Sequence, residues 1–315
     1  MKVKFYNMIT IILLVTLATA LTSCGSKTGT DTKADYKNTY PINVKDQMGR
    51  EIVIEKEPDR IVSLAPSNTE ILFALGLGDK VVGVTNYCDY PEEAKKKEKI
   101  GGFADPNMEK LISLKPDLVL ATIMHEKPVR KLEELKIPVI VLNPQSIDDV
   151  FSTIELIGRA TNKNQQAEEL ISTLKNRIKA VEDRVSTIPA DKRPQVFYEL
   201  WPSPLTTAGP GTFVHDLIEK AGGRNIAADA GKAYPEYSQE MVIDKNPDII
   251  IFSHHYSSNQ SKEDIINRPG WKNIKAIKEG RVFYVDENIV QRPTPRLVDG
   301  LEQFAKIIHP EIFKD

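Results

Sequence analysis

The 315-residue chain has only two cysteines, Cys24 and Cys88. Two thiols can supply neither a disulfide framework nor a cysteine-based metal cluster, which excludes the disulfide-rich secreted domains and the Cys-ligated zinc sites. The formal net charge is -2, with 42 basic against 44 acidic residues. A nucleic-acid-binding protein needs a basic face, so this charge balance argues against that class of partner.

Motifs for catalysis are also missing. The sequence contains no Gly-x-Ser-x-Gly elbow, no Walker loop and no Gly-x-Gly-x-x-Gly after a predicted strand. Its five histidines show no metal-ligand spacing, and the adjacent His254 and His255 would point to opposite faces of a strand. The composition, 41% hydrophobic, is that of an ordinary globular protein, and we expect neither an enzyme nor a bound metal.

The first residues have the pattern of a secretory signal. Lys2 and Lys4 precede an apolar run, residues 8–21, that is too short to cross the hydrocarbon core as a helix. The run ends in Leu-Thr-Ser-Cys24, which resembles the lipobox of bacterial lipoproteins. This resemblance implies a lipoprotein signal peptide over residues 1–23, acylation of Cys24 and an extracytoplasmic protein anchored in the cell membrane. A plain signal peptide with an incidental cysteine is the alternative.

The polar, Gly/Ser/Thr-rich residues 24–40 predict a flexible tether. Residues 41–146 begin with a hairpin expected around residues 46–50, and strands and helices alternate after it. Ser67-Asn68-Thr69-Glu70 has the pattern of a capping box, which predicts a helix opening there and ending near Gly76. Expected strands are 61–64, 81–84, 118–120 and 139–142, and further helices are 108–114 and 129–135. Such alternation predicts a parallel sheet covered on both faces.

Residues 147–188 are predicted to be helical throughout, with a break within 158–162. Beyond the break, apolar residues recur at intervals of three and four from Ala167 to Val185, which predicts one long helix of about twenty-two residues, or about 33 Å. Strand and helix patterns resume over 189–315. We therefore expect an α/β fold in which two Rossmann-like lobes with mostly parallel sheets are joined by one long backbone helix, with a ligand cleft between the lobes.

An internal repeat supports two similar lobes. The segment starting at Asn107 (NMEKLISLKPDLVL) matches the segment starting at Ser238 (SQEMVIDKNPDIII). Each begins with a helix-capping residue, has a Glu two positions later and continues through Pro-Asp into a strand. Glu109 and Glu240 therefore occupy equivalent positions, and two such charges suit a partner with twofold symmetry. The alternative is that each Glu merely stabilises the first turn of its helix.

Aromatic side chains and one arginine are the candidate ligand contacts. Loops that follow parallel strands face the crevice where α/β proteins bind ligands, and aromatic residues there suit a large, flat, partly apolar ligand. Two prolines stiffen the loop Arg292-Pro-Thr-Pro-Arg296 after the last strand, where Arg292 could bind carbonyl, carboxylate or phosphate groups. For Arg296 we favour a salt bridge at the last helix. The aromatic residues in such loops are Tyr87, Tyr90, Phe103, Trp201, Tyr234, Tyr237 and Tyr256.

The chain resembles the cobalamin-binding branch of the helical-backbone substrate-binding proteins, which serve ATP-binding-cassette (ABC) importers for cobalamin, ferric siderophores and haem. The resemblance extends over residues 42–315. Its motifs are RIVSLAPSNTEILFALGLGDKVVGVTNYCDYP, GGFADPNMEKLISLKPDLVLA, LTTAGPGTFVHDLIEKAGGRNIAAD, YPEYSQEMV, NPDIII and RPTPR.

The resemblance implies a set of ligand contacts, with some substitutions. Tyr87 and Arg292 stand where the cobalamin binders have a cleft Tyr and Arg. Phe103 and Tyr234 each replace a Trp, and Asn288 replaces an Asp. Leu200 replaces a Phe, with Trp201 beside it as a substitute ring. The resemblance also implies that Glu109 and Glu240 dock on arginine pockets of a permease dimer, which works with its ATPase subunits.

The sequence thus predicts a monomeric, membrane-anchored solute-binding lipoprotein that delivers a corrinoid and holds no cofactor of its own. A ferric siderophore or haem binder is the alternative within the class, with His254, His255, Tyr or Met as axial candidates for haem. A surface hydrolase and a metal-ion receptor are the alternatives from other classes.

Overall fold

The computed structural model describes residues 37–254 and 258–314 of the chain. The predicted signal sequence and Cys24 lie outside these residues, as do His255 and Tyr256. No helix in the described part is both long and apolar enough to cross a membrane.

The first half is built on a four-stranded sheet in which every neighbouring pair is parallel, with strand order β4-β3-β5-β6. The strands are β3 (Ile61–Ser63), β4 (Val81–Val84), β5 (Leu118–Thr122) and β6 (Val139–Leu142). Its helices are α2 (Pro66–Ala74), α3 (Met108–Ser113) and α4 (Glu126–Glu134). The predicted hairpin precedes them as the antiparallel pair β1 (Ile42–Lys45) and β2 (Glu51–Ile54).

The second half repeats this topology. Its parallel sheet has the order β10-β7-β11-β12, so in both halves the second strand lies at one edge and the first strand lies between the second and third. The strands are β7 (Gln195–Glu199), β10 (Arg224–Asn225), β11 (Ile249–Phe252) and β12 (Val282–Tyr284). The helices are α7 (Phe213–Lys220), α8 (Gln239–Lys245), α9 (Ser258–Ile266), α10 (Lys275–Lys278), α11 (Glu287–Val290) and α12 (Leu297–Ile308). A short antiparallel hairpin, β8 (Trp201–Pro202) with β9 (Leu205–Thr206), follows β7.

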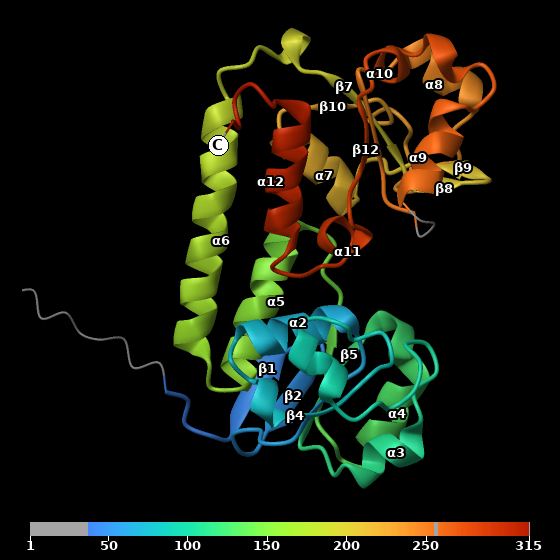
Figure 1. Cartoon of the computed structure of the whole chain (residues 1–315). Coiled ribbons are helices and arrows are strands. Elements are labelled where there is room, and N and C mark those ends of the chain that lie inside the picture. Colours follow the sequence, from blue (N-terminus) through green and yellow to red (C-terminus); the bar gives the residue numbers. More distant parts are fainter. Residues whose placement is uncertain (1–36, 255–257, 315) are drawn as a thin grey trace, which may run out of the picture. The chain divides into compact units, whose positions relative to one another are not determined.

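Two helices connect the halves, α5 (Ile147–Ala160) and the 22-residue α6 (Asn164–Val185), with the predicted break between them. The apolar face of α6 is buried at Ala167, Leu174, Ile178, Val181 and Val185, as its periodicity predicted. Figure 1 shows α6 alongside α12, and Arg177 of α6 binds Asp299 and Glu302 of α12. One hydrophobic cluster runs from the first sheet through α5 and α6 to the second, so the link is packed along its length.

The predicted capping box at Ser67 is wrong. Helix α2 begins at Pro66, and its N-cap residue, two residues before Ser67, is Ala65, which makes no side-chain cap. Proline suits this first position because its missing N–H would be unpaired there in any case. Glu70, which a capping box would turn back toward the N-cap, is buried and bonded to arginines of the second half.

The folded part also extends into the segment predicted as a tether. The amide of Asn38 donates to Asn162 at 2.8 Å, and the hydroxyl of Tyr40 donates to the carbonyl of Ala160 at 3.1 Å. Asn162 has a positive φ of 58° in the turn between α5 and α6. Residues 38–40 are therefore fixed to this turn, which we call the α5–α6 elbow.

Candidate functional site

A pocket of about 930 Å³ lies at the carboxyl ends of the first sheet's strands. This is the place where α/β folds bind ligands, and the volume falls within the usual range for ligand sites. Residues following β3, β4, β5 and β6 line it from the first half, and residues 287–293 complete it from the second. The lining residues are Ala65–Asn68, Asn86, Tyr87, Asp89, Phe103, Thr122–Met124, Leu142–Pro144, Glu287, Asn288 and Gln291–Pro293.

Four of the residues predicted as ligand contacts meet at this pocket: Tyr87, Phe103, Asn288 and Arg292. Tyr87 is 60% exposed, so its ring has a free face for a ligand. Asn288 and Arg292 come from α11 and the proline-rich loop that follows it. The four residues supply two rings from the first half, and an amide and a guanidinium from the second.

Leu200, Trp201 and Tyr234 are not among the residues that line the pocket. Leu200 packs against the main core cluster, and the hairpin of β8 and β9 carries Trp201. The indole Nε1 of Trp201 donates to the carbonyl of Ser203 at 3.0 Å, so its polar group is satisfied locally. Tyr234 is 60% exposed, in a segment whose backbone pairs with residues 205–209. The structure does not bring these three together with the other four.

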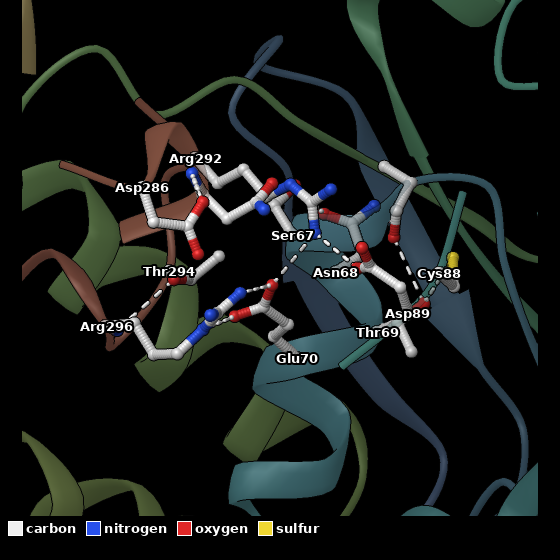
Figure 2. Close-up of polar contacts among 12 residues, drawn as sticks. Ser67, Asn68, Thr69, Glu70, Cys88, Asp89, Asp286, Arg292, Thr294 and Arg296 are labelled. Atoms are coloured by element: carbon white, nitrogen blue, oxygen red, sulfur yellow. Dashed lines mark hydrogen bonds and ion pairs between the residues drawn. The ribbon is translucent and has the colours of Figure 1, made fainter. Parts of the chain in front are cut away.

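An ion-pair network joins the two halves beside the pocket (Figure 2). Glu70 of α2 has only 2% of its side chain exposed and accepts hydrogen bonds from Arg296 at 2.6 and 2.7 Å and from Arg292 at 3.4 Å. Burial lowers the pKa of Arg296, but its bond to Glu70 more than compensates and leaves that pKa raised. The Arg296 guanidinium also lies 4.0 Å from the centre of the Tyr90 ring. The predicted salt bridge of Arg296 is therefore confirmed, with its partner in the opposite half.

Arg292 continues this network to the pocket surface. Its Nη1 donates to the carboxylate of Asp89 at 2.7 Å, and Figure 2 shows the arginine lying between Glu70 and Asp89. Burial raises the pKa of Asp89, but the hydrogen bond and charge of Arg292 outweigh it and hold that pKa below its usual value. Asp89 is therefore ionised at neutral pH and offsets the charge of Arg292.

His125 fixes the position of Phe103. The backbone N–H of Thr122 donates to His125 Nδ1 at 3.0 Å, so the ring proton is on Nε2, which donates to the carbonyl of Phe103 at 2.7 Å. The Phe103 ring packs edge-on against the imidazole, with centroids 5.1 Å apart. Burial lowers the pKa of His125, and its backbone hydrogen bonds oppose that only in part, which favours the neutral ring.

Sequence reasoning missed most of the polar lining. Five carboxamides line the pocket, from Asn68, Asn86, Asn143, Asn288 and Gln291, and only Asn288 was predicted. The available signal was position, because Asn86 and Asn143 lie within two residues of the ends of β4 and β6. Asp89 and Glu70 carried no such signal, because their partners are more than 200 residues away in the sequence.

His254 does not face the pocket. It is 4% exposed, and its Nε2 lies 3.0 Å from the carboxylate of Glu199, which also binds Arg268 at 2.7 and 2.9 Å. His254 is therefore not available as an axial ligand at the pocket. Within residues 37–254 and 258–314, no three His, Cys, Asp or Glu side chains form a group that could hold a metal ion.

Glu109 and Glu240 occupy equivalent places in the two halves. Each lies in the first turn of the helix that precedes the third strand of its sheet, α3 before β5 and α8 before β11. The helices have the predicted caps, since Asn107 accepts from the amide of Lys110 and Ser238 from that of Met241. Both carboxylates are exposed and neither lines the pocket.

A model of the periplasmic binding protein family matches residues 61–289, which span both sheets. The chain belongs to this family. The two parallel-sheet halves joined by α5 and α6 confirm the expected helical-backbone fold of these binding proteins.

Three similar proteins illustrate the family. An uncharacterized ABC transporter substrate-binding lipoprotein, YvrC of Bacillus subtilis, is 38% identical over 96% of this chain and 97% of its own. A cobalamin-binding protein of Halobacterium salinarum is 31% identical over 88% of this chain and 76% of its own. The crystal structure of a possible iron-binding (periplasmic solute-binding) protein from Staphylococcus epidermidis has a TM-score of 0.72 and 36% identity, covering 81% of this chain and 100% of that one.

These matches establish the general activity. This periplasmic binding protein is the substrate-binding component of an ABC transporter and is not an enzyme.

Proposed function

We propose that this protein captures cobalamin or a related corrinoid outside the cytoplasm and delivers it to the permease of an ABC importer. The observation that carries the proposal is the pocket of about 930 Å³, to which both halves contribute and which carboxamides and two aromatic rings line. A corrin macrocycle offers broad apolar faces to aromatic rings and amide side arms to hydrogen-bonding groups. The relative from Halobacterium salinarum, named as a cobalamin-binding protein, supports this ligand class.

In this proposal each group of side chains has a separate task. Tyr87 and Phe103 contact the faces of the macrocycle, with Phe103 positioned by His125. Asn288 and Arg292 hydrogen-bond to its rim from the second half. Leu200, Trp201 and Tyr234 lie outside the residues that line this pocket.

Delivery is proposed to depend on the two equivalent glutamates. Glu109 and Glu240 would bind cationic pockets on the two subunits of a permease dimer, which the ATPase subunits drive. Both carboxylates are exposed, so a partner protein can reach them. The protein would act as a monomer, anchored in the cell membrane through lipid on Cys24.

Haem or a ferric siderophore is the second candidate ligand, and two exposed side chains favour it. Tyr87 and Met124, 60% and 64% exposed, both line the pocket, and phenolate and thioether groups are haem axial ligands in other proteins. The Staphylococcus epidermidis protein described as possibly iron-binding is consistent with this candidate.

The visible absorption spectrum separates these candidates. The full chain is expressed in cells supplied with corrinoid and haem, extracted in mild detergent and purified without denaturation. Corrin absorption bands that persist through purification are the expected result. A Soret band in their place would assign haem, and binding of neither chromophore to the purified protein at micromolar concentration would reject both ligands.

A further inference from the structure

The charged groups of the pocket compensate one another before a ligand binds. Among the lining residues that the structure describes, the charged side chains are those of Asp89, Glu287 and Arg292. The guanidinium of Arg292 is paired directly with the carboxylate of Asp89, at 2.7 Å. Behind the lining, Glu70 lies opposite Arg296, so the second arginine is balanced as well. The described lining therefore has no excess positive charge with which to attract an anion.

Arg292 nevertheless keeps hydrogen-bond donors for a ligand. Both of its ion pairs, with Asp89 and with Glu70, are made through Nη1. Its Nε and Nη2 donate to no residue in the described part of the chain, and the side chain is 22% exposed at the pocket. A guanidinium whose charge is offset but whose N–H groups are free suits a neutral acceptor such as an amide carbonyl.

The carboxamides of the pocket also suit a neutral, amide-containing ligand. The side chains of Asn86 and Asn288 line the pocket and form no hydrogen bond to any described residue. A carboxamide both donates and accepts, so it pairs fully with another amide. Against a carboxylate only its N–H₂ group can bond, while its oxygen is repelled.

We infer that this pocket selects ligands whose rim is neutral and rich in amides and discriminates against ligands of similar size whose rim carries carboxylates, and that Asp89 sets this preference by compensating Arg292. An anionic rim would approach Asp89 and meet like charge. The inference deepens the proposed function by naming the chemistry of the rim, and rests on it for the size and flatness of the ligand.

The test uses two corrinoids that share a macrocycle and differ at the rim. Dicyanocobinamide carries amide side arms, and dicyanocobyrinic acid carries carboxylic acids in their place. The quantity measured is the ratio of their dissociation constants for the full chain, acid over amide, by titration calorimetry at neutral pH. We expect the native protein to bind the amide at least tenfold more tightly.

Asp89→Asn exposes the charge of Arg292 and should lower this ratio about tenfold, the gain expected from one new charge-assisted hydrogen bond. Adding Arg292→Gln to that variant removes the exposed charge and should return the ratio toward its native value. Glu92→Gln is the matched control, because this nearby glutamate is exposed and pairs with Lys95 instead of Arg292. It should leave the ratio unchanged. Thermal unfolding of each variant checks that it is folded.

Three results would overturn the inference: equal or tighter binding of the acid by the native protein, an unchanged ratio in Asp89→Asn, or an equal change in Glu92→Gln. A second pair of probes, a ferric hydroxamate without negative charge and a strongly anionic ferric catecholate, separates the inference from the proposed function. Preference for the hydroxamate without binding of either corrinoid would reject the corrinoid and retain the rim selectivity. Preference for the catecholate would reject the rim selectivity.

Discussion

Arg296 donates two hydrogen bonds to Glu70, from Nε at 2.7 Å and from Nη2 at 2.6 Å, although 226 residues separate the two in the sequence. The pair joins the start of α12 to α2 (Figure 2). Because Glu70 is almost completely buried, removing its charge leaves two arginines without the carboxylate they share.

Glu70→Gln should therefore lower the free energy of unfolding by about 3 kcal/mol, as expected when one member of a buried ion pair is lost. Chemical denaturation monitored by circular dichroism measures this. Asp183→Asn is the control, since Asp183 pairs with Lys179 on the exposed surface of α6 and should contribute less than about 1 kcal/mol. Equal losses in the two variants would show that the Glu70 pair has no special role.

The contrast between local and long-range signals explains what the sequence could predict. Alternating strands and helices, the paired repeat and the apolar face of α6 are local patterns, and the structure confirms them. The role of Glu70 depends on arginines more than 200 residues away, so its neighbours suggested a capping box instead.

The same distinction applies to the pocket. Tyr87 follows β4 by three residues and reaches the site, and Phe103 reaches it from the longer connection between β4 and α3. Trp201 also follows a strand, but the β8–β9 hairpin and the bond from its indole to Ser203 position it elsewhere. The position of Trp201 after a strand does not reveal this hairpin. The pairing of β8 with β9 is set by contacts between their own residues, and it decides where Trp201 lies.

Phe103→Ala should weaken binding of a corrinoid by about 1–3 kcal/mol, because it removes an aromatic face from the pocket. Trp201→Ala is the matched comparison and should change the affinity far less, since Trp201 is not part of the lining. Titration calorimetry gives the affinities and thermal unfolding the stabilities. A large fall in melting temperature with unchanged affinity would place Phe103 in the core instead of the site.

The buried imidazole of His125 predicts a pH dependence of stability. Burial lowers its pKa in the folded protein below the ordinary value of 6.5. As the pH falls through about 6.5, the unfolded chain binds a proton at this residue and the folded protein does not, so the free energy of unfolding decreases. Above about 6.5 both forms are neutral and this contribution is constant.

His125→Gln removes the titrating group and should reduce the fall in melting temperature between about pH 7.5 and pH 5.5 relative to the native protein. Scanning calorimetry at the two pH values measures it. An equal fall in melting temperature in both proteins would show that His125 does not cause this pH dependence.

Reversal of the two equivalent glutamates should separate docking from ligand binding. In Glu109→Lys with Glu240→Lys, lysines would face the cationic pockets proposed on the permease, at a cost of several kcal/mol. Transport into reconstituted vesicles should collapse, while ligand affinity stays near the native value, since neither residue lines the pocket.

The double variant Glu109→Gln with Glu240→Gln removes both charges without reversing them, and it should give an intermediate loss of transport. Native transport by the double Lys variant would reduce both residues to charges that stabilise their own helices.

Cys24→Ala should release the protein from the membrane fraction, because it removes the proposed site of acylation. Detergent-free fractionation followed by immunoblotting measures the distribution. Cys88→Ala is the control, since this buried thiol contacts Thr69 and Thr85 inside the first half. Retention of the Cys24 variant on membranes that lack the permease would reject the anchor.

The attachment of Asn38 to the α5–α6 elbow limits how far the folded part can extend from an anchor at Cys24. Residues 25–37 separate this point from Cys24, and a fully extended chain of that length spans at most about 45 Å. With lipid on Cys24, every collision with a permease in the same membrane takes place within that radius. The search is then two-dimensional, and for a given number of receptors a shorter segment confines them to a thinner layer, which raises their effective concentration at the permease.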